Sequence, residues 1–270
     1  MKYSVLITVY DKDNPRYFEQ ALKSMINQTV KPSEIVIVKD GKINKSLSMV
    51  IDNNRKIFKN IVEIDLPKNV GLGLALNEGI KKCKYNLIAR MDSDDISAEN
   101  RCEKQLEKFK KNKKLDIVGS PVLEFKDDIF NIVGKRKVPL TNEEIYKYAR
   151  RRDPFNHPTV MYKKDSVLAV GGYGNYRKNQ DTDLWIKMLH NKCQCANCEE
   201  YLLYFRFDDN TYKKRKSWTN TKLLIKIRWN AYKIGFCSFF DFLSVMIMQL
   251  GIFIMPLSFQ KFVYRKFLRK

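Results

Sequence analysis

The stretch Arg90-Met91-Asp92-Ser93-Asp94-Asp95 decides the fold prediction, and it follows Tyr85-Asn86-Leu87-Ile88-Ala89, a short apolar run typical of a buried strand. Three carboxylates within four residues repel one another, so each resists ionising unless a cation lies among them. The simplest partner is a hard divalent ion, Mg²⁺ or Mn²⁺, that itself holds a phosphate. In open α/β sheets such ligands bind at the carboxyl ends of the strands, where these aspartates would lie. An acidic turn leading into a helix after Ser97 is the alternative.

Composition places the chain among globular proteins with an unevenly spread positive charge. Its 270 residues, 44% hydrophobic and 30% charged, suffice for one large domain or one domain with an appendage. Between Asn210 and Lys270 there are 13 Lys plus Arg and one acid, Asp241, so about +12 of the net +21 lies in the last 61 residues. Such a basic tail indicates an anionic partner, either nucleic acid or an anionic membrane face.

The N-terminus and the cysteines indicate a reducing compartment. The chain runs straight into a strand-like segment at Tyr3–Val9 and shows no signal-peptide pattern, so we expect a cytoplasmic protein with six reduced cysteines. Cys193, Cys195 and Cys198 have a spacing that resembles a zinc site, but a second pair of ligands at a set distance is missing. Buried thiols are the favoured interpretation.

Apolar runs alternate with helical patterns along the first two thirds of the chain. This order predicts a doubly wound, mostly parallel sheet with right-handed crossovers. The expected strands are Ser4–Tyr10, Glu34–Val38, Ile61–Leu66, Tyr85–Ala89, Thr159–Tyr162 and Leu202–Phe207. The expected helices begin at Pro15, Leu72, Ser97 as N-cap, Thr141 as the start of a capping box, and Asn179. Ile117–Phe125 and Ile129–Val133 flank Lys126-Asp127-Asp128 as a predicted hairpin.

The ordered set of motifs resembles the large family 2 of inverting, GT-A-fold glycosyltransferases, in the branch that builds bacterial surface polysaccharides. The resemblance covers about the first 207 residues and implies a catalytic domain over 1–207, with a nucleotide half at 1–95 and an acceptor half at 96–207. Residues 208–270 then form a basic, membrane-associating helical region. The residues that carry the likeness are Ser4–Tyr10, Glu34–Gly41, Asn69–Gly79, Ala89–Asp95, His157–Met161, Gly171–Tyr173 and Asp181–Trp185.

The resemblance implies donor-binding roles for residues at several strand ends. Thr8 and Asp40 match residues that hold the nucleotide base, typically uracil, and Tyr10 matches an aromatic position of similar members. Asn69 and Gly71 match the loop beside the nucleotide. Arg90 matches a basic residue near the diphosphate, and Ser93 lies within the acidic motif of the donor site.

The same resemblance implies the metal ligands and the catalytic base. Asp92 and Asp94 match the family's DxD pair, which binds Mn²⁺ or Mg²⁺. His157 matches a residue near the metal or diphosphate, with a histidine satisfied within its own loop as the alternative. Asp181 matches the acid of a Glu-Asp pair that acts as general base, and Gln180 stands where Glu is common. The tyrosine usual after that pair is Thr182.

Inverting transfer agrees with these residue types. One carboxylate must take the proton of the acceptor hydroxyl, a contribution of roughly 10²–10⁴-fold. The leaving nucleoside diphosphate needs a metal as Lewis acid. No covalent sugar–enzyme intermediate is required, so two carboxylates that straddle the bond are not expected.

The tail contains a nearly apolar run, Phe242–Leu257, after the basic run Lys213-Lys214-Arg215-Lys216. A spanning helix needs about 20 apolar residues, and Asp241 would cost about 2.5–3.5 kcal/mol at mid-bilayer. The chain ends in Tyr264–Lys270, which mixes aromatics with cations as interfacial helices do. Monotopic or re-entrant attachment is favoured over a true span and over a helix packed on the catalytic domain or in a dimer. We therefore expect the cytoplasmic face of an anionic membrane, and a lipid-linked glycan acceptor.

The leading interpretation is a metal-dependent transferase that uses a UDP-sugar. A nucleic-acid-binding protein is the runner-up because of the +21 charge, but no nucleic-acid motif is visible and we expect no such partner. A sugar-phosphate nucleotidyltransferase ranks lower, because Thr8-Val9-Tyr10-Asp11 lacks the glycine-rich loop of that class. The Arg150–His157 and Gly171–Asn179 loops are expected to shape the pocket that selects sugar and acceptor.

Overall fold

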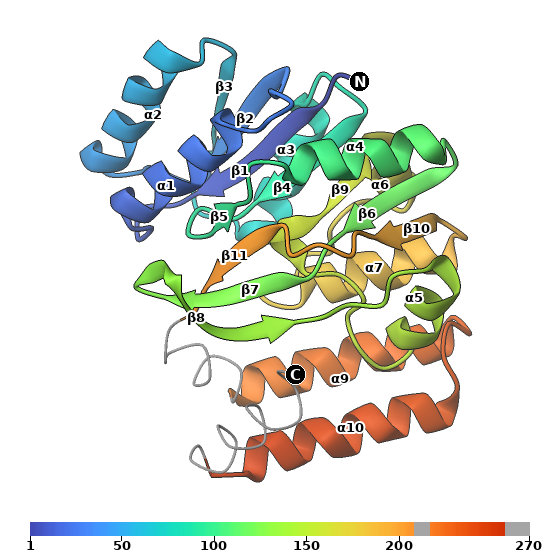
Figure 1. Ribbon diagram of the computed structural model, residues 1–270. Helices are drawn as coiled ribbons and strands as arrows, with labels where there is room; N and C mark the ends of the chain where they lie inside the picture. The colour runs from blue at the N-terminus through green and yellow to red at the C-terminus, as the bar shows by residue number, and fades with distance from the viewer. Residues whose placement is uncertain (208–216, 257–270) are drawn as a thin grey trace.

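The computed structural model describes residues 1–207 and 217–256 (Figure 1). The basic run Lys213-Lys214-Arg215-Lys216, the end Tyr264–Lys270 and the proposed boundary at residue 208 lie outside the described residues.

A seven-stranded sheet crosses the whole catalytic region in the order β10-β6-β9-β4-β1-β2-β3. All neighbours are parallel except β9, which pairs antiparallel with β4 and β6. The two predicted halves therefore share one sheet, joined at the β4–β9 pair. The strands are β1 Ser4–Val9, β2 Glu34–Lys39, β3 Ile61–Asp65, β4 Leu87–Met91, β6 Leu115–Gly119, β9 Met161–Lys163 and β10 Gln194–Asn197.

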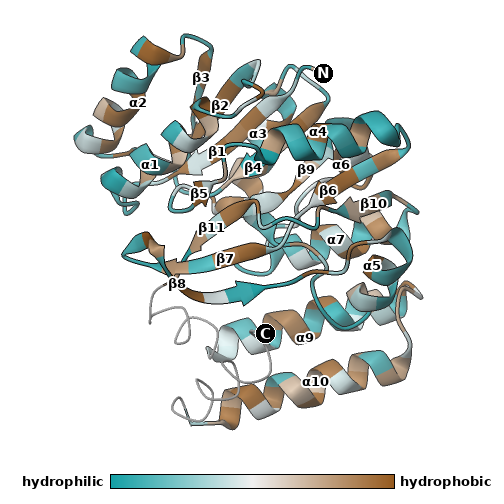
Figure 2. Ribbon diagram, in the orientation of Figure 1, coloured by the Kyte–Doolittle hydropathy of each residue, from teal (hydrophilic) through white to brown (hydrophobic). Residues whose placement is uncertain are grey.

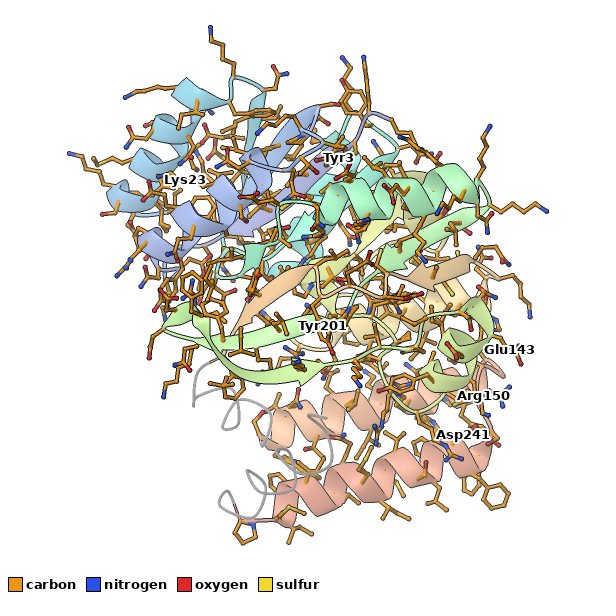
Figure 3. All side chains as sticks on the ribbon, viewed as in Figure 1. Tyr3, Lys23, Glu143, Arg150, Tyr201 and Asp241 are labelled. Atoms are coloured by element: carbon orange, nitrogen blue, oxygen red, sulfur yellow. The ribbon has the colours of Figure 1, made fainter. Side chains whose placement is uncertain are left out.

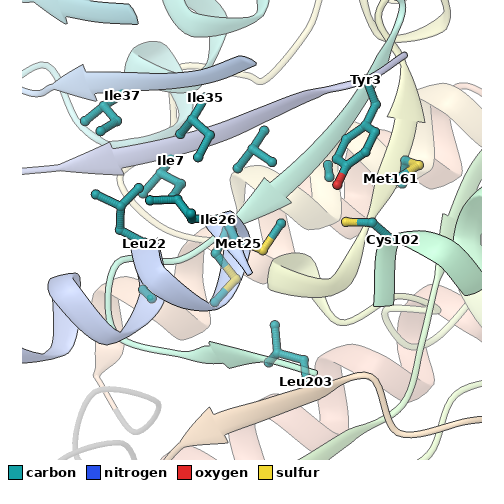
Figure 4. Close-up of a cluster of buried hydrophobic side chains, with 14 of the residues drawn as sticks. Tyr3, Ile7, Leu22, Met25, Ile26, Ile35, Ile37, Cys102, Met161 and Leu203 are labelled. Atoms are coloured by element: carbon teal, nitrogen blue, oxygen red, sulfur yellow. The ribbon is translucent and has the colours of Figure 1, made fainter. Parts of the chain in front are cut away.

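Helices cover both faces of this sheet. Alternate β1 residues point to opposite faces, so Val5 and Ile7 pack in one hydrophobic cluster and Leu6 packs in another. Figure 4 shows the first cluster, in which Leu22 and Met25 lie against β1 and β2. The first face carries α1 Pro15–Ile26, α2 Lys45–Ile57 and α4 Arg101–Lys111; the second carries α3 Leu72–Lys82, α5 Asn142–Ala149, α6 Lys164–Ala169 and α7 Gln180–His190. The predicted doubly wound α/β class is confirmed.

A second sheet of four strands, in the order β5-β11-β7-β8, stands beside the first. Its strands are β5 Ile96–Ser97, β11 Leu203–Arg206, β7 Val122–Lys126 and β8 Asp128–Arg136. The predicted hairpin is confirmed, and Asp127 makes its turn with a positive φ of 64°.

Two expectations about local structure are wrong. The run Ile117–Phe125 is not one strand, because the chain leaves β6 after Gly119 and enters β7 of the other sheet after Pro121. Ser97 is not a helix cap, because it pairs with Leu203 in the second sheet. Helix α4 begins only at Arg101.

Two other predicted elements, the helix at Thr141 and the strand at Thr159, are present, the strand with a small shift of its start. The capping box at Thr141 is present, with Glu144 Oε2 accepting from the Thr141 N–H at 3.0 Å. Residues His157–Thr159 form a short 3₁₀ turn, η1, so the strand predicted from Thr159 begins at Met161.

The C-terminal part forms a helical hairpin, α9 Trp218–Lys233 and α10 Phe239–Ile254. Ile227 and Ala231 of α9 pack with Ile186 of α7, so the hairpin rests on the catalytic region. Most of α10 is apolar (Figure 2). Over the described residues, no helix combines the length and apolar character that crossing a bilayer requires.

Gly79 allows α3 to lie directly on the sheet, and this gives a stability prediction. A Cβ at this position would run into Leu6 Cδ1 and come within 2.8 Å of Val38 Cγ2. Gly79→Ala should therefore lower the free energy of unfolding by about 1–3 kcal/mol through overpacking. Urea unfolding followed by circular dichroism measures it.

Gly251→Ala is the matched control, since a Cβ there meets nothing within 4 Å on the exposed side of α10. Its stability should stay level or rise, because alanine is the better helix former. Equal stabilities of the two variants would contradict the close packing of α3.

Candidate active site

Three carboxylates lie close together just after the carboxyl end of β4, a central strand of the sheet. Oxygens of Asp92, Asp94 and Asp95 lie within 4.8 Å of one another. Asp95 is fully buried; its Oδ1 accepts the Arg206 N–H at 2.8 Å, and its Oδ2 has no hydrogen-bond partner among the described residues. Asp95 thus joins the predicted pair Asp92 and Asp94 as a third candidate ligand.

Two carboxylates of this turn, Asp94 and Asp95, resist ionisation. Desolvation and then the charges of Asp92 and Asp13 raise the pKa of Asp94 to about 6. Burial and the charges of Asp94 and Asp92 raise the pKa of Asp95 well above its usual value. A divalent cation would relieve this repulsion, and carboxylate oxygens are the ligands that Mg²⁺ and Mn²⁺ prefer. The residues present therefore fit a divalent metal ion.

Asp13 is a site residue that the sequence did not single out. Its Oδ2 accepts from the Ser93 hydroxyl at 2.9 Å and from the Tyr10 N–H at 3.1 Å. Burial raises the pKa of Asp13 to about 6. This carboxylate therefore ties the loop after β1 to the acidic turn, and brings the predicted residues Tyr10 and Ser93 to the same place.

The loops after β2 and β3 meet through hydrogen bonds of Asp40. Asp40 accepts the backbone N–H groups of Val70 at 2.7 Å and Gly71 at 3.0 Å. Gly71 has a φ of 95°, a conformation that favours glycine. Arg177 Nη1 donates to Asn69 Oδ1 at 3.0 Å, so a residue from the loop before α7 also reaches this point. Thr8 lies next along the sheet edge, at the end of β1 beside Val38.

Arg90 is a buried cation with free hydrogen-bonding capacity. Its side chain contacts Asp92, while its Nε and Nη1 have no partner among the described residues. It lines a cavity of about 670 Å³ together with Asp92, His157, Gln180 and Asp181. Both groups are themselves buried, so Arg90 contributes positive charge to the wall of this cavity rather than exposed hydrogen-bond donors.

Asp181 enters the cavity from the first turn of α7. Burial and the neighbouring charge of Asp153 raise the pKa of Asp181 to about 6, and Arg90 opposes the shift. Thr182 Oγ1 donates to Asp153 Oδ2 at 2.9 Å, so the threonine in place of the usual tyrosine fixes the carboxylate beside the base. A carboxylate with a pKa near 6 is ionised at neutral pH and still basic enough to accept a proton.

His157 lines the same cavity as Asp92 but does not belong to the group of three carboxylates in the acidic turn. Its Nε2 hydrogen bonds with the Tyr173 hydroxyl at 2.8 Å, and its ring packs against Trp185. Burial and Arg90 lower its pKa well below the usual value. The ring therefore packs against Tyr173 and Trp185, and its position near the metal or diphosphate stays a prediction.

The cysteines agree with the thiol interpretation. All six are free and buried, and Cys195 lies in β10 with its pKa raised to about 12 by burial. Within the described residues the acidic turn is the one group with metal-ligating geometry.

Asp153 gives a pH prediction for the proposed base. Asp153→Asn removes the charge that raises the pKa of Asp181, and the Arg228 guanidinium, now unpaired, acts in the same direction. The acid limb of kcat/KM should therefore move to lower pH, because the base loses its proton more easily.

Glu143→Gln is the control, since it removes an exposed carboxylate from the first turn of α5. An acid limb that stays in place in Asp153→Asn, or that moves equally in both variants, would show that the titrating base lies elsewhere.

An open α/β sheet with helices on both faces and an acidic turn at the carboxyl end of a central strand is the architecture of the GT-A glycosyltransferases. The family model for glycosyl transferase family 2 matches residues 4–170. The chain belongs to this family of glycosyltransferases, as the resemblance predicted.

Two bacterial relatives match over nearly the whole length of the chain. The chain is 39% identical to the Escherichia coli UDP-Gal:alpha-D-GlcNAc-diphosphoundecaprenol beta-1,3-galactosyltransferase over 100% of this chain and 97% of that protein. It is 32% identical to the amylovoran biosynthesis glycosyltransferase AmsE of Erwinia amylovora, over 98% of each.

Solved structures show the same fold at low identity. The Pyrobaculum calidifontis mannosyltransferase PcManGT, in complex with GDP-Man and Mn²⁺, matches with a TM-score of 0.67 and 11% identity over 93% of this chain and 69% of that chain. S. aureus TarS 1–349 with UDP-GlcNAc gives 0.65 and 15% over 98% and 75%. The GT-A fold is confirmed.

Proposed function

We propose that this glycosyltransferase moves a sugar, with inversion, from a UDP-sugar to a lipid-linked glycan in surface-polysaccharide synthesis. The observation that carries the proposal is the placement of Asp181 and of the Arg90–Asp92 contact on one cavity. The proposed base and the proposed anion site then line the same cavity of about 670 Å³, in which the reacting sugar would lie.

The donor end lies at the sheet edge. The loops of Asp40 and Asn69–Gly71 would hold the nucleotide, and the positive charge of Arg90 would attract the diphosphate. The printed name of the E. coli relative, which is 39% identical, specifies UDP-Gal, and this supports a UDP-sugar as the donor. UDP-galactose is therefore the first donor to test.

Asp92, Asp94 and Asp95 would hold Mn²⁺ or Mg²⁺, and PcManGT was solved with Mn²⁺. Such an ion acts as a Lewis acid toward the leaving diphosphate. The other work falls to the protein. The Asp181 carboxylate takes the acceptor hydroxyl's proton as that oxygen bonds to the anomeric carbon, and the bond from this carbon to the diphosphate oxygen breaks in the same step. Gln180, buried beside Asp181, replaces the family's Glu without supplying a second base.

The acceptor end lies against the C-terminal hairpin. The E. coli relative is named for a diphosphoundecaprenol-linked acceptor. Phe240 is 75% exposed, Ile247 61% and Ile254 77%, so α10 presents an apolar outer face. Together with the net charge of +21, this face would hold the protein on the anionic cytoplasmic side of the membrane.

A transfer assay tests the proposal. Purified protein in detergent would receive UDP- or GDP-sugars, a lipid-diphosphate glycan, and Mn²⁺, Mg²⁺ or EDTA. Metal-dependent UDP release with sugar transfer is expected. Tight, salt-sensitive RNA or DNA binding without any donor binding would instead favour the nucleic-acid alternative.

A further inference from the structure

The cavity carries more positive charge than one donor diphosphate needs. Arg90 and Arg177 lie at its donor end, and six further basic side chains also line it. Five acids line the cavity or pair with these cations: Asp92, Asp153 and Asp181 in the lining, Glu124 paired with Arg136, and Asp241 paired with Arg151. A metal ion would itself offset most of the donor's charge, so the excess of cations indicates a second polyanion. The six are Arg136, Lys137, Arg151, Arg152, Lys178 and Arg228.

The short loop after α5 is fixed between the hairpin and the catalytic helix α7. Arg151 Nε pairs with Asp241 Oδ1 of α10 at 2.6 Å, and Arg228 of α9 pairs with Asp153 at 3.2 Å. Arg228 also donates to the Ala149 carbonyl at 2.6 Å. Figure 3 labels Arg150 and Asp241 on the two facing elements. The loop is therefore held rigidly beside Asp181.

Arg152, in the middle of this clamped loop, is left for a ligand. Its side chain lines the cavity, is exposed, and makes no hydrogen bond or ion pair with the part of the chain that the structure describes. A guanidinium in this setting can bind a phosphate with two parallel hydrogen bonds.

The opposite wall is apolar. Val245, Met248 and Ile252 of α10 line the cavity, while Ile247 and Ile254 of the same helix face outward. An amphiphile whose charged head lies at Arg152 could therefore extend its chain along the apolar residues of α10 that line the cavity.

We propose that Arg151, Arg152 and the inner face of α10 form the acceptor subsite, which binds the diphosphate and the first part of the lipid chain of a lipid-diphosphate-linked sugar. This inference rests on the proposed function and gives its acceptor end specific residues. The position suits the chemistry: Asp181 would meet the hydroxyl, and Arg152 the diphosphate on the same sugar.

Binding of farnesyl diphosphate to the full chain tests the subsite without knowledge of the acceptor sugar. The donor site is first saturated with UDP and Mn²⁺, so that the probe cannot bind there. Arg152→Gln should weaken binding of farnesyl diphosphate by about 10-fold or more, since a charge-assisted hydrogen bond is lost. Met248→Glu should weaken it comparably by placing a negative charge in the apolar wall.

Two matched controls keep the test specific. Arg150→Gln removes the same charge from the neighbouring position, which does not line the cavity, and should leave binding within about twofold. Ile247→Glu alters the outward side of α10 and should reduce vesicle binding but not probe binding. Farnesol and inorganic pyrophosphate should both compete poorly, because each supplies only one half of the ligand.

Equal losses in Arg150→Gln and Arg152→Gln would overturn the subsite, as they would show unspecific attraction. Pyrophosphate competing as well as the probe would overturn the lipid part. Metal-dependent UDP binding, measured in the same samples, reports on the donor site alone, so failure of the subsite is distinguishable from failure of the proposed function.

Discussion

Asp181→Asn is expected to lower the rate of sugar transfer by about 10²–10⁴-fold, the usual contribution of a general base. The amide keeps the size of the side chain but cannot take the acceptor's proton. UDP binding should stay near the wild-type value, because the nucleotide loops and the acidic turn are untouched. Transfer kinetics and calorimetry of UDP binding measure the two effects separately.

Asp183→Asn is the matched control, two residues further along the same helical turn. Asp183 pairs with Lys187 at 2.6 Å and does not line the cavity, so its loss should affect stability more than turnover. Comparable rate losses in both variants would mean that a damaged α7 start, rather than a missing base, explains the defect.

Asp94→Ala is expected to abolish metal-dependent donor binding. Loss of an outer-shell partner typically costs 10–100-fold in metal affinity, so loss of a direct ligand should cost at least about 100-fold. Titration of Mn²⁺ in the presence of UDP measures the change. EDTA should reproduce the variant's phenotype in the wild type.

Asp52→Ala, which removes an exposed acid on α2, serves as the control for charge alone. UDP binding that persists both in EDTA and in Asp94→Ala would contradict the proposed role of a metal ion in donor binding.

The sequence predicted the fold well where the signal was local. Buried strands such as β1 and β4 are short apolar runs, and the carboxylates that follow β4 lie at the sheet edge as parallel topology requires. The loops at Asn69–Gly71 and before α7 also reach the same site, where Arg177 bonds Asn69.

The predictions that were wrong, and the contacts that were missed, involve segments far apart in the sequence. Ser97 has good capping chemistry, but strand pairing with Leu203 takes precedence. The Arg228–Asp153 pair joins residues 75 positions apart, so no local sequence pattern reveals it. Asp13 could have been suspected from its position after the first strand, where the polar loop Asp11–Asn14 begins the donor edge. No local pattern could have indicated that Arg151 meets α10.

The anomeric configuration of the product tests the central claim most directly. After transfer from an α-linked UDP-sugar to a lipid-diphosphate acceptor, NMR of the new glycosidic bond reports on the displacement. A single attack assisted by Asp181 predicts a β linkage that disappears in Asp181→Asn. An α linkage would contradict it, because a single displacement at the anomeric carbon inverts the configuration and cannot give retention.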